Sequence, residues 1–422
     1  MGGNPLQRII SGVMVLVNGR FTPSDIIIDE GRIVSVSPAA QALSDTPLYA
    51  LPGFTDVHVH LREPGFSYKE TIATGTRAAA RGGYTAVCAM PNLQPAPDSP
   101  EHLKVQLDII EQDAVIDVRP YGTITVNEEG EQLSDMEALA PKVVAFSDDG
   151  HGVQNDDMMR AAMRKAKSLR RLIAAHCEDN SLLRGGCIHD GEYAKAHGIP
   201  GICSESEWGQ IARDIDLVRE TGCGYHVCHI STKESVEIIR RAKAEGLDVS
   251  CETAPHYLLL TDMDLRDEGR FKMNPPVRAR EDRAALIEGL IDGTVDMIAT
   301  DHAPHAAEEK AKGLRGSAMG IVGLETAFPL LYTHLVKKQG IIPLERLVDL
   351  MSAAPAKRFG LDSGITPGKA ANLALWDLDA EYAIDPADFQ SKGKATPFEG
   401  WKVCGRCVET IYHGQTVWCM NR

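Results

Sequence analysis

The stretch "FTDVHVHLREPG", residues 54–65, places two histidines one residue apart at the end of an apolar, strand-like run. Side chains two residues apart in a β-strand point to the same side, so we expect His58 and His60 to face inward together. Val57 and Val59 should then pack outward against helices. Neutral imidazole is the commonest protein ligand for zinc-like metals. A lone histidine is more often an ordinary core residue, so the interpretation depends on what neighbouring strands carry.

Around this stretch the chain alternates between strand-like and helical segments. Apolar strand-like runs occur at 53–61, 84–92, 117–126, 142–150, 171–179, 224–231, 247–257 and 295–305. Amphipathic helical stretches lie between most of them, at 69–83, 155–170, 232–246 and 280–294. Eight strand–helix units in this length predict an α/β fold of the (β/α)₈ TIM barrel type.

The two ends of the chain have a different pattern. Residues 6–51 and 363–422 contain short strands with Gly-centred turns, including Asn18-Gly19 between two apolar runs. We therefore predict a small composite β-sandwich domain made of residues 1–51 and 362–422. Residues 52–361 should form the metal-dependent barrel that holds the active site.

Composition and charge narrow the class of protein. The 422 residues carry a net charge of -15 without a long block of Lys or Arg, which argues against nucleic acid and anionic membranes as partners. The sequence has no membrane-length apolar run and no export signal, so we expect a cytoplasmic protein whose ten cysteines are reduced. Cys404 and Cys407 could begin a zinc site with His413 and Cys419, but ordinary packing is the favoured interpretation.

Most of the predicted barrel strands end in residues suited to metal or acid–base chemistry. These are His58 and His60, Asp148 and Asp149, His176, His229 and Asp301. Catalytic residues of such barrels come from the C-terminal strand ends, so the side chains should meet. Six ligands exceed what one tetrahedral zinc needs, and two metals sharing a bridging carboxylate fit better. Asp149 is the favoured bridge because it alternates with Ser147, and Asp148 remains the alternative.

Taken together, these motifs resemble the amidohydrolase superfamily, and specifically the class I dihydroorotases, over essentially the whole chain. The matching stretches are "DVHVHLREPG", "MPN" at 90–92, "AFSDDG", "AAHCED", "HVCHIST", "NPPVR" at 274–278, "ATDHAPH" and "GIVGLETAF". The resemblance implies an enzyme with two zinc ions that interconverts N-carbamoyl-L-aspartate and L-dihydroorotate in pyrimidine biosynthesis. Relatives often carry Asp where this chain has Asn372, in the accessory domain and away from the catalytic steps.

The resemblance also implies roles for individual residues. One zinc would be held by His58, His60, Asp149 and Asp301, and the other by Asp149, His176 and His229. The substrate carboxylate would be bound by Arg62, Asn92 and His305, and the ring by Asn274 and the backbone at Met319 and Gly320. A homodimer is expected, and an association with aspartate carbamoyltransferase is possible.

Chemistry supports two of these roles independently. Asp301 can take a proton from the attacking hydroxide and pass it to the departing nitrogen, although a pure ligand role is the alternative. Arg62 can grip a carboxylate through two parallel hydrogen bonds, unless it forms an ion pair with Glu63 or Asp56. His302 should orient its loop, and the charged loop at 302–316 could act as a lid.

Two other functions compete with this interpretation. Allantoinase- or hydantoinase-type cyclic amidases use a carboxylated lysine near the end of strand 4, and the only nearby lysine here, Lys142, comes several residues too early. Some dihydroorotase-like chains are non-catalytic partners of aspartate carbamoyltransferase that have lost ligands, whereas all the proposed ligand positions are intact here.

Overall fold

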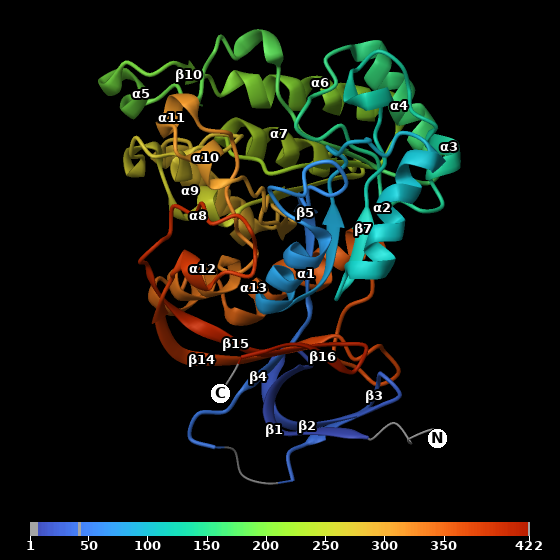
Figure 1. Ribbon diagram of the computed structural model, residues 1–422, viewed down its shortest axis with the longest axis vertical. Coiled ribbons are helices and arrows are strands. Elements are labelled where there is room, and N and C mark those ends of the chain that lie inside the picture. The colour runs from blue at the N-terminus through green and yellow to red at the C-terminus, as the bar shows by residue number, and fades with distance from the viewer. Residues whose placement is uncertain (1–6, 41–43, 421–422) are drawn as a thin grey trace.

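Strands from both ends of the chain form one seven-stranded mixed sheet at one end of the molecule (Figure 1). The computed structural model describes residues 7–40 and 44–420. The strand order is β16-β15-β14-β4-β1-β2-β3. The strands are β1 (Arg8–Val17), β2 (Arg20–Asp29), β3 (Arg32–Pro38), β4 (Tyr49–Pro52), β14 (Leu373–Ala383), β15 (Lys402–Tyr412) and β16 (Gln415–Cys419).

The short strand β4 joins the two ends of the chain. It pairs with β1 in parallel and with β14 antiparallel, so the N-terminal and C-terminal strands meet edge to edge. Within residues 7–40 and 44–420, the strands of the two chain ends therefore pair into one continuous sheet. The sequence had predicted a β-sandwich, which consists of two packed sheets. The expected Asn18-Gly19 turn is present, and both residues have the positive φ that a tight hairpin of this kind requires.

The middle of the chain contains parallel strands in two groups. The first is β5 (Phe54–Val59), β6 (Tyr84–Ala89) and β7 (Asp117–Pro120). The second is β8 (Ile173–Ala175), β11 (Tyr225–Val227), β12 (Val249–Thr253) and β13 (Met297–Ile298). Single parallel bridges link the groups at both edges, through Phe146 on one side and His302 on the other. The fourth predicted strand is reduced to the bridge at Phe146, because the chain turns away immediately after it.

Helices cover the outside of these strands (Figure 1). The longer ones are α1 (Ile72–Arg81), α2 (Pro100–Asp113), α4 (Asp156–Ser168), α6 (Glu205–Thr221), α7 (Lys233–Ala244), α9 (Arg280–Asp292), α13 (Leu344–Met351) and α14 (Ala353–Phe359). Several begin where the sequence supplies an N-cap: the side chains of Thr71, Asn155 and Thr232 accept hydrogen bonds from the first turns of α1, α4 and α7. Among the described residues, no helix is long and apolar enough to cross a membrane.

The terminal sheet packs directly on the parallel strands. Trp376 of β14 is 1% exposed and contacts Phe54 at the start of β5 and Phe328, with ring centroids 5.7 and 4.3 Å apart. A side chain at Gly83 would place its Cβ 2.5 Å from the Trp376 ring, so the close approach requires glycine there. The shared core holds the strand-end residues in a fixed position relative to the C-terminal segment, which matters for the site below.

Candidate metal centre and active site

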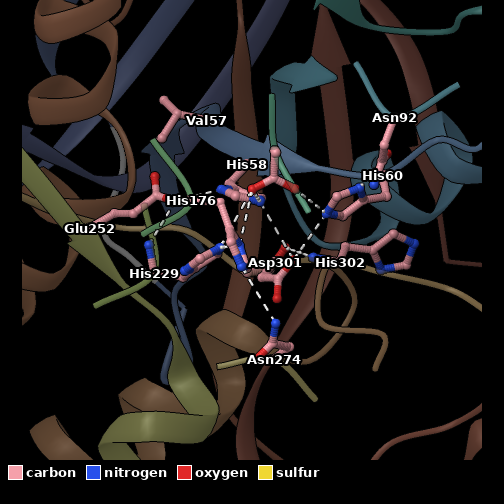
Figure 2. Close-up of polar contacts among 12 residues, drawn as sticks. Val57, His58, His60, Asn92, His176, His229, Glu252, Asn274, Asp301 and His302 are labelled. Carbon is pink, nitrogen blue, oxygen red and sulfur yellow. Dashed lines mark hydrogen bonds and ion pairs between the residues drawn. The ribbon is translucent and has the colours of Figure 1, made fainter. Parts of the chain in front are cut away.

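Four histidines and two aspartates from separate strand ends converge in one buried cluster (Figure 2). Asp149 lies at its centre. Its Oδ1 is 3.3 Å from His58 Nε2, 3.5 Å from His229 Nε2 and 3.7 Å from His176 Nδ1. Its Oδ2 is 3.4 Å from His60 Nε2.

Asp301 closes the cluster from the opposite side. Its Oδ1 lies 3.2 Å from His60 Nε2 and 3.6 Å from His58 Nε2. Three sets of ligand atoms are close enough to hold a metal ion, and two of them share Asp149, namely His58 with His60 and Asp149, and His176 with His229 and Asp149. The third, His58 with Cys228 and Glu252, lies behind His58. The six positions predicted from the strand ends are thus brought together, and Asp149 is common to the first two sets.

The donor atoms at the centre are arranged for a cation. His58 Nε2 and Asp149 Oδ1 are buried and face each other, yet neither has a hydrogen-bond partner. An unpaired buried polar atom is costly, and a shared metal ion would satisfy both atoms. Neutral imidazole nitrogens together with carboxylate oxygens form a donor set suited to zinc-like metals. The residues present therefore fit a metal centre.

Neighbouring side chains orient these imidazoles. The Nδ1 of His58 lies 2.8 Å from Glu252 Oε1, so its N–H donates to the carboxylate and the Nε2 lone pair faces Asp149. The Nδ1 of His60 lies 2.9 Å from Asn92 Oδ1, which directs Nε2 inward in the same way. Figure 2 shows both rings pointing toward the cluster with Glu252 and Asn92 behind them.

Backbone geometry departs from simple strand alternation at this site. Arg62, His229 and Asp301 have φ values of 62°, 33° and 46°, a region that non-glycine residues rarely adopt. Such strain concentrates at functional sites, where the surrounding structure holds it in place. The outward packing predicted for Val57 is wrong. The pairing register shifts between Asp56 and Val59, and Val57 belongs to a separate apolar cluster with other strand residues, while Val59 belongs to the main hydrophobic core.

The two neighbouring aspartates have separate environments. Asp148 Oδ1 accepts hydrogen bonds from the backbone N–H groups of Ile124 and Thr125, at 2.7 and 3.0 Å, and its other oxygen accepts from the Thr125 hydroxyl. Its burial raises the pKa of Asp148 to about 6. Asp149 alone contacts the histidines. Because residues 147–149 are not in a strand, alternation with Ser147 is not the reason, and the turn that follows Phe146 sets the direction.

Electrostatics keeps the central carboxylates ionised. Burial opposes ionisation of Asp149, but the surrounding imidazoles, first of all that of His58, hold the pKa of Asp149 well below its usual value. The pKa of Asp301 is also lowered, because the nearby imidazoles, first of all that of His60, outweigh the effect of burial. Glu252 overcomes its burial through hydrogen bonds from His226 and His58, which lower its pKa to about 2.

Arg62 lies beside this cluster without an acidic partner. It is 8% exposed, and its Nε donates to the carbonyl of Pro304 at 3.2 Å. Among the described residues no carboxylate forms an ion pair with its guanidinium. Glu63 accepts from Ser67 and the backbone of Ile72 instead. Burial lowers the pKa of Arg62, while the charges of Asp301 and Asp149 oppose that change. A buried arginine with free N–H groups is a binding site for an anion.

Asn274, which is predicted to bind the substrate ring, has a side-chain oxygen that is free to accept a hydrogen bond. Its Nδ2 lies 3.4 Å from His176 Nε2, and its buried Oδ1 has no hydrogen-bond partner. Asn92, predicted to bind the carboxylate, uses its Oδ1 on His60. Asn274 therefore has an oxygen available for a ligand donor, and Asn92 has its Nδ2 group.

The remaining predicted substrate residues form a local hydrogen-bonded group. His305 Nε2 donates to the carbonyl of Met319 at 2.7 Å, and Lys69 Nζ lies 3.3 Å from His305 Nδ1. The N–H of Gly320 donates to the carbonyl of Lys272. Burial, Arg62 and Lys69 lower the pKa of His305 to about 3, so this imidazole is neutral. In this geometry both ring nitrogens of His305 are engaged within the protein.

Comparison with known proteins identifies the family. A family model described as "Dihydro-orotase-like" matches residues 49–235, and one described as "Amidohydrolase family" matches residues 224–418. Dihydroorotases of Bacillus cereus (strain B4264) and Bacillus thuringiensis (strain Al Hakam) are each 50% identical to this chain over 408 residues, covering 95% of both chains. The chain belongs to the dihydroorotase family of amidohydrolases.

Solved structures agree with this dihydroorotase assignment at the level of the fold. The L-hydantoinase (dihydropyrimidinase) from Arthrobacter aurescens is 26% identical, with a TM-score of 0.85 over 98% of this chain and 96% of that one. The dihydropyrimidinase from Brevibacillus agri NCHU1002 has the same TM-score at 23% identity, covering 98% of this chain and 95% of that one. Both similarities span the terminal sheet as well as the parallel strands.

Sequence reasoning missed the residues that support the clustered histidines. Glu252 contacts His58 and, at 3.0 Å, His226, which in turn lies 2.8 Å from Ser250. Glu178 lies 3.6 Å from His176 Nε2. One signal was available: "VSCET" places a carboxylate inside an otherwise fully buried strand, where it needs partners.

Lys142 and the pair Cys404 and Cys407 lie away from the histidine–aspartate cluster. Lys142 is exposed and lines a separate cavity with Asp117 and Arg171, so it is not at the cluster. Cys404 and Cys407 are free, buried thiols with different neighbours, Glu381 and Thr410, which agrees with ordinary packing.

His302 is held by contacts on several sides, and its role in orienting the loop stays a prediction. Its carbonyl accepts from the N–H of His60, its Nδ1 accepts from Gly323, and its Nε2 lies 3.4 Å from Glu70. The 302–316 segment contains two short helices, α10 (Ala307–Lys310) and α11 (Gly313–Gly316), and whether it acts as a lid stays a prediction. In the terminal sheet, Asn372 accepts from the N–H of His413.

Proposed function

We propose that this chain catalyses the reversible cyclisation of N-carbamoyl-L-aspartate to L-dihydroorotate, a step of de novo pyrimidine biosynthesis. The observation that carries the proposal is the buried guanidinium of Arg62 beside the histidine–aspartate cluster, which forms no ion pair with a described carboxylate. Both compounds carry a carboxylate that such a group recognises through two parallel hydrogen bonds. Membership of the dihydroorotase family supports the same reaction.

The metal content belongs to the same proposal. We infer two zinc ions, one held by His58, His60, Asp149 and Asp301, and the other by Asp149, His176 and His229. The two sets of ligand atoms that share Asp149 support this inference. Bound metal ions would supply a water of lowered pKa, near 7, and would stabilise negative charge on the carbonyl oxygen.

The chain's own residues would do the positioning and the proton transfer. Arg62 would hold the substrate carboxylate, and Asn274 would accept a hydrogen bond from a ring N–H through its free Oδ1. Asp301, kept ionised by His60 and its neighbours, would take a proton on its carboxylate and return it to the departing nitrogen. Closing the ring reverses these transfers.

We also propose a domain architecture and an oligomeric state for the chain. The bridges at Phe146 and His302 support closure of the parallel strands into a (β/α)₈ barrel over 52–361. Residues 1–51 and 362–422 would form the accessory domain around the terminal sheet. We also propose a cytoplasmic homodimer that can associate with aspartate carbamoyltransferase, which sedimentation velocity with and without that enzyme would test.

A hydantoinase-type activity is the second candidate, because the similar solved structures include hydantoinases. Lys142 lines a separate cavity, which argues against it. Asp149 would take the bridging role instead, since its carboxylate lies within 3.7 Å of His58, His176 and His229. The test measures turnover of dihydroorotate, hydantoin and allantoin by the purified chain, together with its metal content. Faster turnover of hydantoin would refute the proposal. Activity that appears only when aspartate carbamoyltransferase is added would favour the non-catalytic partner.

A further inference from the structure

A C-terminal segment, residues 391–395, lies close to the candidate site, against Pro304 and Val322. The backbone N–H of Val322 donates to the carbonyl of Ala395 at 3.0 Å. A Cβ added to Gly393 would lie 2.6 Å from Pro304, whose carbonyl binds Arg62. Pro304 therefore lies between this segment and Arg62, the proposed carboxylate-binding residue.

This segment is anchored by a buried carboxylate. Glu70, which is fully buried, accepts from the hydroxyl of Ser391 and from the backbone N–H of Lys392 at 3.2 Å, and it also contacts His302. Since His302 directly follows Asp301, the segment is tied to the strand end that carries the proposed proton carrier. Its position relative to the site is thereby set.

Two lysines of this segment carry uncompensated charge. Lys392 and Lys394 are exposed, and their ammonium groups donate to the carbonyls of Ser67 and Phe389, both at 2.6 Å. Within the described part of the chain, no carboxylate forms an ion pair with either of them. Both lysines line a cavity of about 260 Å³ that also includes His305.

The other cations around this cavity are neutralised or weakened. Arg270 pairs with Glu268 at 2.6 Å and with Glu399 at 2.9 Å. Lys310 is buried against two carbonyls, and burial lowers the pKa of Lys310 to about 7. Among the described residues that line this cavity, Lys392 and Lys394 are therefore the ones that keep a full, unpaired positive charge.

We propose that Lys392 and Lys394 form a cationic entrance that attracts the anionic substrate and delivers it to Arg62. The inference rests on the proposed function for the identity of the substrate. The chain carries a net charge of -15, so an approaching dicarboxylate is repelled by most of the surface. A local positive potential at the mouth would offset that repulsion and raise the encounter rate.

The kinetic test uses the double variant Lys392→Gln/Lys394→Gln. At about 0.01 M salt, where charges act over about 30 Å, we expect kcat/KM for N-carbamoyl-L-aspartate to fall about fivefold with kcat unchanged. At about 1 M salt, where the range shrinks to about 3 Å, the variant and the parent should agree within about twofold. Lys392→Arg/Lys394→Arg should retain the parent value at both salt concentrations.

A matched control removes the same charge elsewhere. Lys338 and Lys402 are exposed, have no carboxylate partner among the described residues and do not line this cavity. Lys338→Gln/Lys402→Gln should change kcat/KM by less than about twofold. The equilibrium constant of the reaction does not depend on the enzyme. The glutamine variant must therefore lower kcat/KM by the same factor in both directions, and this equality is an internal check of the kinetic data.

A second readout does not depend on turnover. In a Cys419→Ser background, the added substitution Ala395→Cys places a thiol in the cavity wall. The rate ratio of its alkylation by anionic iodoacetate and neutral iodoacetamide reports the local potential. We expect that ratio to fall about fivefold when Lys392 and Lys394 become glutamine.

The outcomes separate the two proposals. If the protein does not turn over N-carbamoyl-L-aspartate but the alkylation ratio changes as expected, the proposed function is refuted and the cationic entrance is supported. An active enzyme whose glutamine variant matches the control in salt dependence and alkylation ratio would overturn the entrance. A fall in kcat/KM of equal size at low and high salt would also overturn it, because that result indicates a structural effect.

Discussion

Replacing Arg62 with methionine tests the carboxylate-binding role directly. The Nε of Arg62 is already bound to Pro304, so its Nη groups are the donors left for a ligand. Two charge-assisted hydrogen bonds contribute about 1.5–3 kcal/mol each, and partial replacement by water reduces their sum to about 3–4 kcal/mol. At about 1.4 kcal/mol per tenfold change, Arg62→Met should lower kcat/KM by about 10²–10³-fold.

The loss should appear mainly in KM. The carboxylate is not the reacting group, so Arg62 binds it equally in the ground and transition states, and kcat should change little. Stability should respond differently. Arg62 is buried and pairs with no carboxylate in the described part of the chain. Methionine removes the desolvation cost of that charge, so the midpoint of thermal unfolding should not fall.

Steady-state kinetics in both directions and thermal unfolding of the same preparations measure both effects. Arg77→Met, at an exposed position of α1, is the matched control and should leave both unchanged. Arg62→Lys keeps the charge but loses the planar fork, so its KM should lie between the two. An unchanged KM in Arg62→Met, or a large loss of stability with a proportionate loss of activity, would refute the reasoning.

Three further predictions follow from the contacts of single side chains. Asp301→Asn should lower kcat by about 10³-fold while calorimetric binding of N-carbamoyl-L-aspartate survives, since the variant loses the proton carrier; retained turnover would remove Asp301 from that role. Glu252→Gln weakens the acceptor that orients His58, so metal affinity measured against a competing chelator should drop about 10–100-fold. Lys310 has a folded pKa of about 7, below its unfolded value of about 10.4, so it adds stability as pH rises through that window. Urea unfolding of the parent and of Lys310→Met should therefore show a larger advantage for the parent at about pH 9.5 than at about pH 6.

Several features of the fold were predictable because they depend on short-range patterns. The Asn18-Gly19 hairpin and the strand-like runs at the two ends of the chain appear where the sequence predicts them. The prediction of outward packing failed at Val57, because a register shift interrupts the alternation that the prediction assumed. The prediction of a fourth strand over 142–150 was also wrong in its length. In that segment of the described chain only Phe146 forms β-bridges, to Gly122 and Ile173.

The sequence by itself determined which chemical groups stand at the strand ends, because two-residue periodicity and turn residues are local properties. His58, His60, His176, His229 and Asp301 could therefore be named in advance. Only the tertiary structure decided how those groups are used. The contact that orients His58 comes from Glu252, 194 positions away, and Asp149 rather than Asp148 faces the histidines because the turn after Phe146 directs it there. Such contacts depend on how distant strands pack side by side, which no local pattern specifies.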